Sequence, residues 1–333
     1  MKTFHKKSQV FDNYTILQNL GKGVGGRIFK AKHKTTGKVV ILKVKRVQNL
    51  ANLDTFRKRI QDQFELLKAI PASDHKNLVQ YYDVLCIKYN KYAEIIIIME
   101  YVEGENLYEV MEAMDVERHS VSVREAMMFM ESSFKILDEL HSRNIVHRDV
   151  KPENWMVSPQ GLKLVDFDLV CLDYSKKRKY PRALMHQGLT CVKLPNSLVC
   201  DYTTYPGTTI YFSPELLQAS VANLKDPSHL DAKSIEVWAE GVVVLDLLMR
   251  GIGEDCYVPT LRATPNIVDG HHVGGRYLVI AKFLRSERMT KTMRVFRPLI
   301  MRILATNPKH RPSTREILQE LDDIKKKNVV LFG

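Results

Sequence analysis

The chain has 333 residues, of which 45% are hydrophobic and 26% are charged, and its formal net charge is +12. This length accommodates one large domain or two modest lobes with an ample apolar core. The positive charge favours acidic or phosphate-bearing partners. The sequence shows no zinc-finger, homeodomain or aromatic-rich RNA-binding pattern, so we expect no specific nucleic-acid partner.

Five cysteines are scattered along the chain without any Cys-x-x-Cys spacing: Cys86, Cys171, Cys191, Cys200 and Cys256. Their odd number and spacing predict reduced thiols and no structural zinc. The N-terminal residues lack the apolar core of a signal peptide, and no apolar run is long enough to span a membrane. We therefore expect an intracellular, cytoplasmic protein, with the nucleus as the alternative compartment. The sequence does not indicate the oligomeric state.

The first predicted elements are two strands joined by a glycine-rich turn. Tyr14 to Leu20 is a strand-like run, Gly-Lys-Gly-Val-Gly-Gly follows from Gly21 to Gly26, and a second strand-like run begins at Arg27. Rossmann folds use the same glycine spacing, but there a helix follows the glycines and an acidic residue comes about 20 residues later. Here no acidic residue lies between Asp12 and Asp54, whereas nine Lys or Arg do. A glycine hairpin in a positive field suits a bound triphosphate.

The next elements alternate between strands and helices. The β-branched run from Val39 ends at Lys43 and predicts a strand, and Leu53 to Ile70 has the helical period. Glu94 to Met99 is apolar enough for a buried strand, and Ser122 begins a capping box that starts a further helix. One face of that helix is expected to lie in the core: Met127, Met130, Phe134, Leu137 and His141.

The stretch from Asn144 to Leu169 contains the residue types that phosphoryl transfer needs. Asp149 is followed by Lys151 and Asn154, and then two short strands surround a Ser-Pro-Gln-Gly turn before Asp166. The hairpin is expected to return the chain so that Asp166 lies near Asn154. An acid to accept a hydroxyl proton, a cation for the transferring phosphoryl group and two oxygen ligands for magnesium are then present.

The motifs His-Arg-Asp-Val-Lys-Pro-Glu-Asn, from His147, and Asp-Phe-Asp, from Asp166, resemble the catalytic and metal-binding loops of eukaryotic-type serine/threonine protein kinases. The resemblance implies that Asp149 is the catalytic base and that Lys151 contacts the γ-phosphate. Asn154 and Asp166 would hold Mg²⁺, with Mn²⁺ as the alternative metal, and Arg148 would meet a phosphate on the activation segment. Lysine two residues after the aspartate is the serine/threonine pattern.

The resemblance also implies an ATP site in the N-terminal part. Lys43 would pair with the α- and β-phosphates of ATP, Met99 resembles the gatekeeper, and Glu100 and Val102 belong to the hinge that meets adenine. The expected ATP-binding residues are Leu20, Gly21, Lys22, Gly23, Val24, Gly25, Gly26, Arg27, Ile28, Lys43, Glu100 and Val102.

Four later residues extend the resemblance. Thr208 matches the threonine that touches the catalytic aspartate and lysine, and Glu215, in a Ser-Pro-Glu motif, should pair with Arg311. Glu236 replaces the aspartate that usually anchors the backbone of the catalytic loop. Small-molecule kinases of related fold usually lack these motifs, so we expect protein substrates and not small molecules or lipids.

Three positions depart from the family pattern. Ile41 stands where alanine is usual, Gln63 where a helix glutamate holds the strand lysine, and Asp168 where the metal loop has glycine. The amide oxygen of Gln63 could still accept a hydrogen bond from Lys43. These departures support one alternative, a pseudokinase that binds nucleotide as a scaffold or allosteric regulator. Because glycine would restore the usual loop, we expect Asp168→Gly to raise activity or leave it similar.

The expected fold is α+β and bilobal, with a small β-rich N-lobe that holds one helix and a larger, mainly helical C-lobe. The kinase domain is predicted over residues 14–324, the N-lobe over about 14–103 and the C-lobe over about 104–324, with short extensions at 1–13 and 325–333. A basic run, Lys176 to Lys179, lies in a predicted activation segment from Leu169 to Tyr205. The expected enzyme is an ATP-dependent serine/threonine protein kinase.

Overall fold

The computed structural model describes residues 12–23, 26–70, 75–173, 200, 207–222, 230–250 and 291–328. Val24 and Gly25 of the predicted phosphate loop, and the basic run Lys176 to Lys179, lie outside these residues. The chain divides into two compact units. Unit 1 comprises the described residues up to Gly104 together with Val165–Asp168, and unit 2 comprises the described remainder.

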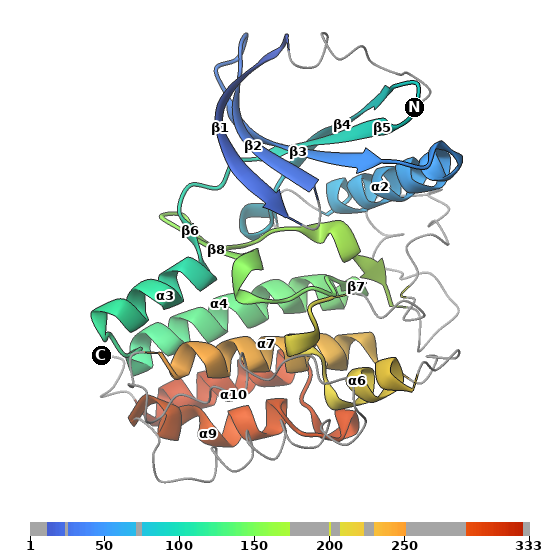
Figure 1. Cartoon of the computed structure of the whole chain (residues 1–333). Helices are drawn as coiled ribbons and strands as arrows, with labels where there is room; N and C mark the ends of the chain where they lie inside the picture. The colour runs from blue at the N-terminus through green and yellow to red at the C-terminus, as the bar shows by residue number, and fades with distance from the viewer. Residues whose placement is uncertain are drawn as a thin grey trace. The chain divides into compact units, whose positions relative to one another are not determined.

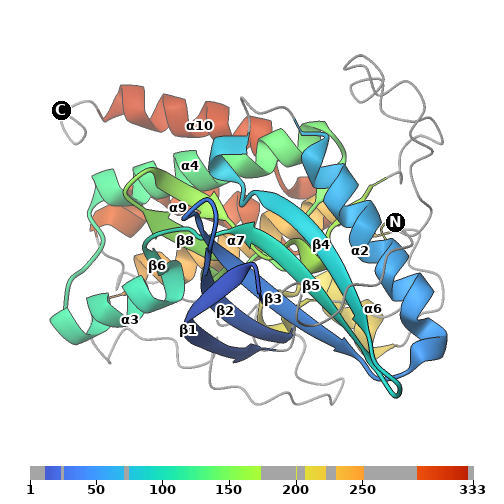
Figure 2. The ribbon, with the colours of Figure 1, turned by 90° about the horizontal axis from the view of Figure 1, so that it is seen from above.

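Unit 1 is built on a five-stranded antiparallel sheet with the strand order β1-β2-β3-β5-β4. One helix, α2, lies beside β4 (Figures 1 and 2). The strands are β1 (Tyr14–Gly23), β2 (Gly26–His33), β3 (Val39–Val47), β4 (Tyr81–Lys88) and β5 (Ala93–Glu100), and the helices are α2 (Leu53–Lys68) and the 3₁₀ turns Leu50–Asn52 and His75–Asn77.

The sheet is held by apolar residues that alternate along its strands. Val40, Leu42 and Val44 of β3 pack with Ile96 and Ile98 of β5 in one buried cluster. Because side chains alternate between the two faces of a strand, Lys43 lies on the face opposite to Leu42. The buried apolar cluster on one face of β3 therefore holds the backbone from which Lys43 extends on the other face.

The glycine-rich turn joins two antiparallel strands, as predicted. Lys22 pairs with Arg27 and Gly23 with Gly26 across the β1–β2 hairpin, which rules out the Rossmann arrangement of a strand followed by a helix. Gly26 has a φ of +123°, and a Cβ atom there would lie 2.3 Å from the carbonyl oxygen of Val44. Only glycine fits so close to β3.

Unit 2 is mainly helical. Its helices are α3 (Leu107–Glu117), α4 (Val123–Ser142), α6 (Pro214–Val221), α7 (Ala232–Leu248), α9 (Lys291–Ile303) and α10 (Thr314–Lys327). Short strands form small antiparallel pairings: β6 (Glu105–Asn106), β7 (Ile145–Val146), β8 (Trp155–Ser158), β9 (Gly161–Leu164) and β10 (Cys171–Leu172). The 3₁₀ turns are Pro152–Asn154, Thr209–Tyr211 and Pro308–His310, and a further turn, Phe167–Leu169, begins in the residues of unit 1.

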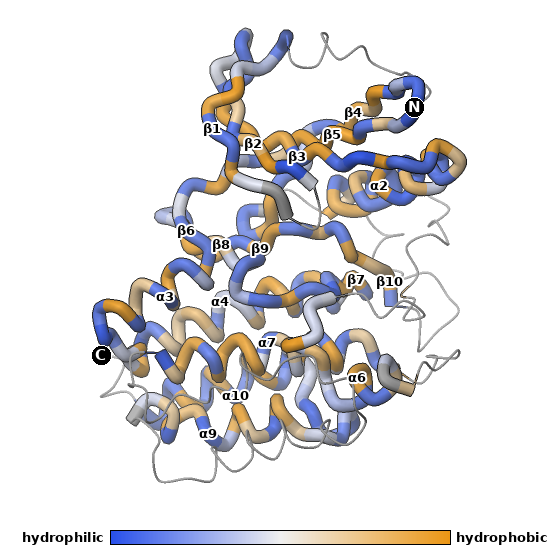
Figure 3. Tube along the Cα trace, viewed as in Figure 1, coloured by the Kyte–Doolittle hydropathy of each residue, from blue (hydrophilic) through white to orange (hydrophobic). Residues whose placement is uncertain are grey.

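The core of unit 2 forms around α7, which packs against α4 and α9 and whose apolar turns are orange in Figure 3. The predicted core face of α4 is confirmed: Met127, Met130, Phe134 and Leu137 are buried. The Ser122 capping box is also present. In the part of the chain that the structure describes, no helix has the length and apolarity needed to cross a membrane.

A disulfide joins Cys171 of β10 to Cys200, so the prediction of reduced thiols is wrong for this pair. The backbone explains the bond, because the amide of Cys200 donates to the carbonyl oxygen of Leu172 at 3.0 Å and the two cysteine Cα atoms lie 4.9 Å apart. Cys86 is a free, buried thiol. The intracellular location predicted from these thiols stays a prediction, and the disulfide removes part of its basis.

Candidate active site

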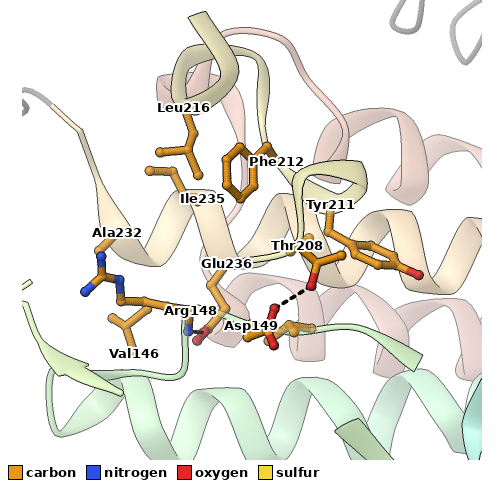
Figure 4. A pocket seen from close by; sticks show the side chains of 12 residues that line it. Val146, Arg148, Asp149, Thr208, Tyr211, Phe212, Leu216, Ala232, Ile235 and Glu236 are labelled. Carbon is orange, nitrogen blue, oxygen red and sulfur yellow. Dashed lines mark hydrogen bonds between the residues drawn. The ribbon is translucent and has the colours of Figure 1, made fainter. Parts of the chain in front are cut away.

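The loop that carries Asp149 is anchored on a buried carboxylate of α7, as predicted. Glu236 Oε1 accepts hydrogen bonds from the backbone amides of His147, at 2.7 Å, and Arg148, at 2.9 Å, and its Oε2 lies 2.7 Å from His141 Nε2. Arg148 has a φ of 70°, which is unfavourable for a residue with a side chain. The bonds to Glu236 hold this backbone conformation (Figure 4).

Two carboxyl groups one turn apart on α7 are in opposite protonation states. Burial would raise the pKa of Glu236, but the hydrogen bond and the charge of His141 hold the pKa below its ordinary value. Burial raises the pKa of Glu240 to about 8, although Glu240 Oε2 accepts a 3.0 Å hydrogen bond from Trp155 Nε1. At neutral pH, Glu236 is therefore a carboxylate and Glu240 a neutral acid.

Asp149, Lys151 and Thr208 form a closed triangle of polar contacts. Thr208 Oγ1 donates to Asp149 Oδ1 at 2.8 Å and accepts from Lys151 Nζ at 3.0 Å, and Lys151 Nζ lies 2.9 Å from Asp149 Oδ2. The predicted contacts of Thr208 with both residues are confirmed. Figure 4 shows Thr208 above Asp149, at the edge of a pocket that Phe212 and Leu216 also line.

The triangle sets the charge of Asp149. Burial alone would raise the pKa of this carboxyl group, but the hydrogen bond and charge of Lys151, with the hydrogen bond of Thr208, hold the pKa below its ordinary range. Asp149 is thus ionised at neutral pH and can accept a hydrogen bond from a hydroxyl group.

Gly207 packs closely on the loop that carries Asp149. Gly207 has a φ of +121°, and a Cβ atom there would lie 2.8 Å from the carbonyl oxygen of Arg148. The space between the two segments therefore requires glycine. This close approach places Thr208 beside Asp149.

The predicted pair of Glu215 and Arg311 is confirmed as a two-pronged ion pair. Arg311 Nη1 and Nη2 lie 2.6 and 2.7 Å from the two carboxylate oxygens of Glu215. Arg311 Nε also donates to the carbonyl oxygen of Ala305 at 2.8 Å, and the guanidinium group lies 4.9 Å from the ring centroid of Trp238. These contacts tie the start of α6 to the segment before α10.

Asn154 has an amide oxygen suited to a metal ion. Its Nδ2 donates to the carbonyl oxygen of Asp149 at 2.7 Å, and among the described residues no group donates a hydrogen bond to its Oδ1. Amide oxygens are among the hard ligands that Mg²⁺ prefers. The described residues hold no group of three or more His, Cys, Asp or Glu side chains able to bind a metal alone.

In unit 1, Lys43 is buried and paired with the metal loop. Its Nζ lies 2.8 Å from Asp166 Oδ1 and 2.7 Å from Asp168 Oδ2. Burial would lower the pKa of Lys43, but the charges of Asp168 and Asp166 raise the pKa overall. Lys45 also contacts Asp168 Oδ2, at 2.5 Å. Burial lowers the pKa of Lys45 despite that contact.

Gln63 does not make the predicted hydrogen bond to Lys43. It is buried in α2, and its Nε2 donates instead to the backbone carbonyl oxygen of Asp168 at 2.7 Å. Glu65, two positions further along α2, is exposed and accepts a hydrogen bond from Gln61. Gln63 thus supports the metal loop and leaves Lys43 to other partners.

The metal loop accommodates Asp168 without the conformation that favours glycine. Among the described non-glycine residues with positive φ, Asp166 appears at 63° and Asp168 does not. The backbone amide of Phe167 donates to Tyr81 Oη at 3.3 Å, which further fixes the loop. The sequence-based reasoning missed Lys45 and Tyr81. The signal for Lys45 was its spacing, because a residue two positions after Lys43 lies on the same face of the strand.

The other predicted ATP-binding residues are spread over β1, β2 and the end of β5. Leu20 and Gly21 are exposed, Ile28 is opposite Lys43 in the β2–β3 register, and Arg27 pairs with Glu94 at 3.1 Å. In the predicted hinge, the amide of Glu100 donates to Gln80, and Met99 and Val102 are buried. Their roles toward nucleotide stay predictions.

A buried, acid-paired lysine in the sheet unit and an Asp-Lys-Thr triangle in the helical unit are the features expected of the protein kinase fold. The family described as "Protein kinase domain" matches residues 14–321, and the chain belongs to this family. This match confirms the family and the α+β, two-lobed fold predicted from the sequence.

Named relatives are similar over most of this chain. The carbon catabolite-derepressing protein kinases of Candida glabrata and Saccharomyces cerevisiae are each 27% identical to it over 310 residues, which is 92% of this chain and 41% and 40% of theirs. A probable serine/threonine-protein kinase of Dictyostelium discoideum is 30% identical over 236 residues, 71% of this chain and 23% of its own length. The chain thus spans about two fifths or less of these relatives.

Proposed function

We propose that this chain transfers the γ-phosphate of MgATP to serine or threonine hydroxyl groups of protein substrates. The observation that carries the proposal is the triangle of Asp149, Lys151 and Thr208, which joins a carboxylate, a cation and a hydroxyl within 3.0 Å. The relatives named as serine/threonine kinases support the same substrate class. Lys151 and Thr208 are also the residues that distinguish the serine/threonine pattern in this sequence.

We assign one role to each residue of the candidate site. Asp149 accepts a hydrogen bond from the substrate hydroxyl, orients its oxygen toward phosphorus and takes its proton as the new bond forms. The ammonium group of Lys151 stabilises the negative charge that develops on the γ-phosphoryl oxygens during transfer.

Asn154 and Asp166 would hold Mg²⁺, and Mn²⁺ has the same ligand preference. The metal ion, when bound, supplies positive charge for the β- and γ-phosphates. Lys43 would pair with the α- and β-phosphates. The backbone amides of the glycine hairpin between β1 and β2 can approach phosphate oxygens because the glycines have no side chains.

The pseudokinase alternative gains no support from the structure. The family match covers the whole described site, and the replaced residues, Gln63 and Asp168, take part in ordered contacts with the metal loop and Lys43. The acid, the lysines and the two metal-binding side chains that the reaction needs are all present.

The experiment is transfer of radiolabelled phosphate from ATP to a mixed basic protein substrate, with Mg²⁺, with Mn²⁺ and with a chelator. We expect metal-dependent incorporation by the wild type and its loss in Asp149→Ala, which should still bind ATP. Acid hydrolysis of the labelled substrate should release phosphoserine and phosphothreonine. Equal incorporation by the wild type and Asp149→Ala with both metals would contradict the proposal.

A further inference from the structure

A buried lysine, Lys43, and a half-buried lysine, Lys45, share one carboxylate in unit 1. Lys43 and Lys45 are two positions apart on β3 and so project from the same face of the strand. Asp168 Oδ2 lies 2.7 Å from the Nζ atom of Lys43 and 2.5 Å from that of Lys45. The side chain of Lys43 is 5% exposed and that of Asp168 is 17% exposed. A charge so removed from water is costly unless an opposite charge compensates it, so Asp168 is central to the stability of this cluster.

Helix α2 supplies no carboxylate to the cluster. In protein kinases the strand lysine depends on an ion pair with a glutamate of this helix. Here the matching position is Gln63, whose amide donates to the backbone carbonyl oxygen of Asp168. Glu65 is exposed and bonded to Gln61. Within the described residues, the carboxylates that pair with Lys43 are those of Asp166 and Asp168.

The two carboxylates differ in what else they can do. Asp166 is the proposed metal ligand, so metal binding would draw its oxygens away from Lys43. Asp168 has no such competing task, and its backbone is held by Gln63. Lys45 adds a second cation that pairs with Asp168 Oδ2 and directs this carboxylate at the strand. Only Asp168 can therefore compensate Lys43 throughout nucleotide binding.

We propose that Asp168 is the positioning carboxylate of Lys43, in place of the glutamate that α2 lacks, with Gln63 and Lys45 holding Asp168 in position. The inference rests on the proposed function, because it assigns Lys43 to the phosphates of ATP. Two replacements in the sequence then compensate each other: the carboxylate lost at position 63 is restored at position 168. The expectation that Asp168→Gly preserves or raises activity is therefore reversed, and we now expect Asp168→Gly to lower ATP affinity.

The test compares the wild type with Asp168→Asn, which keeps the shape of the side chain and removes its charge. Loss of one charge-assisted hydrogen bond should raise the KM for ATP by about 10- to 100-fold. It should lower kcat less, because Asp168 touches no reacting atom. Asp168→Glu keeps the charge and should stay within about threefold of the wild-type KM. Glu65→Gln is the matched control, since it removes one exposed carboxylate from unit 1 and should leave KM unchanged.

A second readout does not depend on catalysis. Acylation of Lys43 by an amine-reactive reagent, followed by mass spectrometry, reports how tightly its ammonium group is held. We expect faster acylation of Lys43 in Asp168→Asn than in the wild type or Glu65→Gln, with the thermal unfolding of each variant recorded beside it.

The outcomes separate this inference from the proposed function. A wild type that transfers no phosphate contradicts the proposed function, and the acylation rate of Lys43 still decides whether Asp168 holds it. An active wild type with unchanged KM and unchanged Lys43 acylation in Asp168→Asn overturns the inference alone. If Asp168→Asn does not fold, Asp168→Glu provides the test. A KM for ATP raised tenfold or more in this variant, which retains the charge, would also overturn the inference.

Discussion

The anchor of the catalytic loop gives the sharpest prediction about the fold of the site. Glu236 is buried and accepts hydrogen bonds from two backbone amides, and its second oxygen faces His141. In Glu236→Gln, the amide oxygen can still accept from the backbone of His147 and Arg148. The amide nitrogen then replaces the oxygen 2.7 Å from His141 Nε2, and the charge is lost.

The magnitude follows from the number of bonds affected. Loss of one charge-assisted bond lowers the free energy of unfolding by about 1.5–3 kcal/mol in Glu236→Gln. Glu236→Ala leaves two buried amides without an acceptor, each worth about 1–3 kcal/mol, and also frees the left-handed backbone of Arg148. We expect a loss of about 3–5 kcal/mol there, a large part of the stability of an ordinary domain.

The measurements are urea unfolding and phosphate transfer on the same preparations. We expect kcat to fall in the order wild type, Glu236→Gln, Glu236→Ala, because the loop that carries Asp149 loses its anchor. The depressed pKa of Glu236 means that its contribution to stability is present above pH 4.5 and is lost as the pH falls further. The difference between the wild type and Glu236→Gln should therefore shrink in acid. If Glu236→Ala had the same free energy of unfolding and the same kcat as the wild type, the reasoning would be refuted.

Three further predictions concern stability. Glu240 is neutral in the folded protein up to a pKa of about 8, whereas a free glutamate ionises near 4.5, so the wild type should lose about 1.4 kcal/mol of stability per pH unit between these values. Glu240→Gln should lack this slope in unfolding titrations from pH 5 to 8, and an equal slope in both proteins would contradict the assignment. Arg311→Lys keeps the positive charge but cannot reproduce the two-pronged contact with Glu215. This variant should have a free energy of unfolding lower by about 3 kcal/mol. An unchanged midpoint of urea unfolding would contradict this prediction. Closure of a loop between cysteines 29 positions apart should stabilise the protein by about 3–4 kcal/mol. Non-reducing mass spectrometry should find the Cys171 and Cys200 peptides joined, and finding both as free thiols in protein prepared without reductant would contradict the bond.

Much of the fold could be predicted because local patterns and motifs agree with each other. The glycine hairpin was readable from the strand that follows it, and the capping box at Ser122 marked the start of α4. The contacts of Thr208 with Asp149 followed from motif positions, because both motifs are tied to fixed places in the fold.

The side-chain network around the metal loop could not be predicted in the same way. Gln63 and Asp168 are both visible in the sequence, but which of them contacts Lys43 depends on the rotation of α2 and on the path of the loop after Asp166. The role of Lys45 depends on where the Asp168 side chain lies, which the local sequence does not show. The disulfide depends on a backbone contact between Leu172 and Cys200, which no spacing of cysteines reveals.

The central claim is that the Asp149 carboxylate, held by Lys151 and Thr208, assists transfer of phosphate to a hydroxyl group. The most direct test is the single-turnover rate of γ-phosphate transfer at saturating MgATP in the wild type and Asp149→Asn. We predict a rate lower by about 10²- to 10⁴-fold in Asp149→Asn, with ATP affinity retained by calorimetry. Equal single-turnover rates in the two proteins would contradict the account.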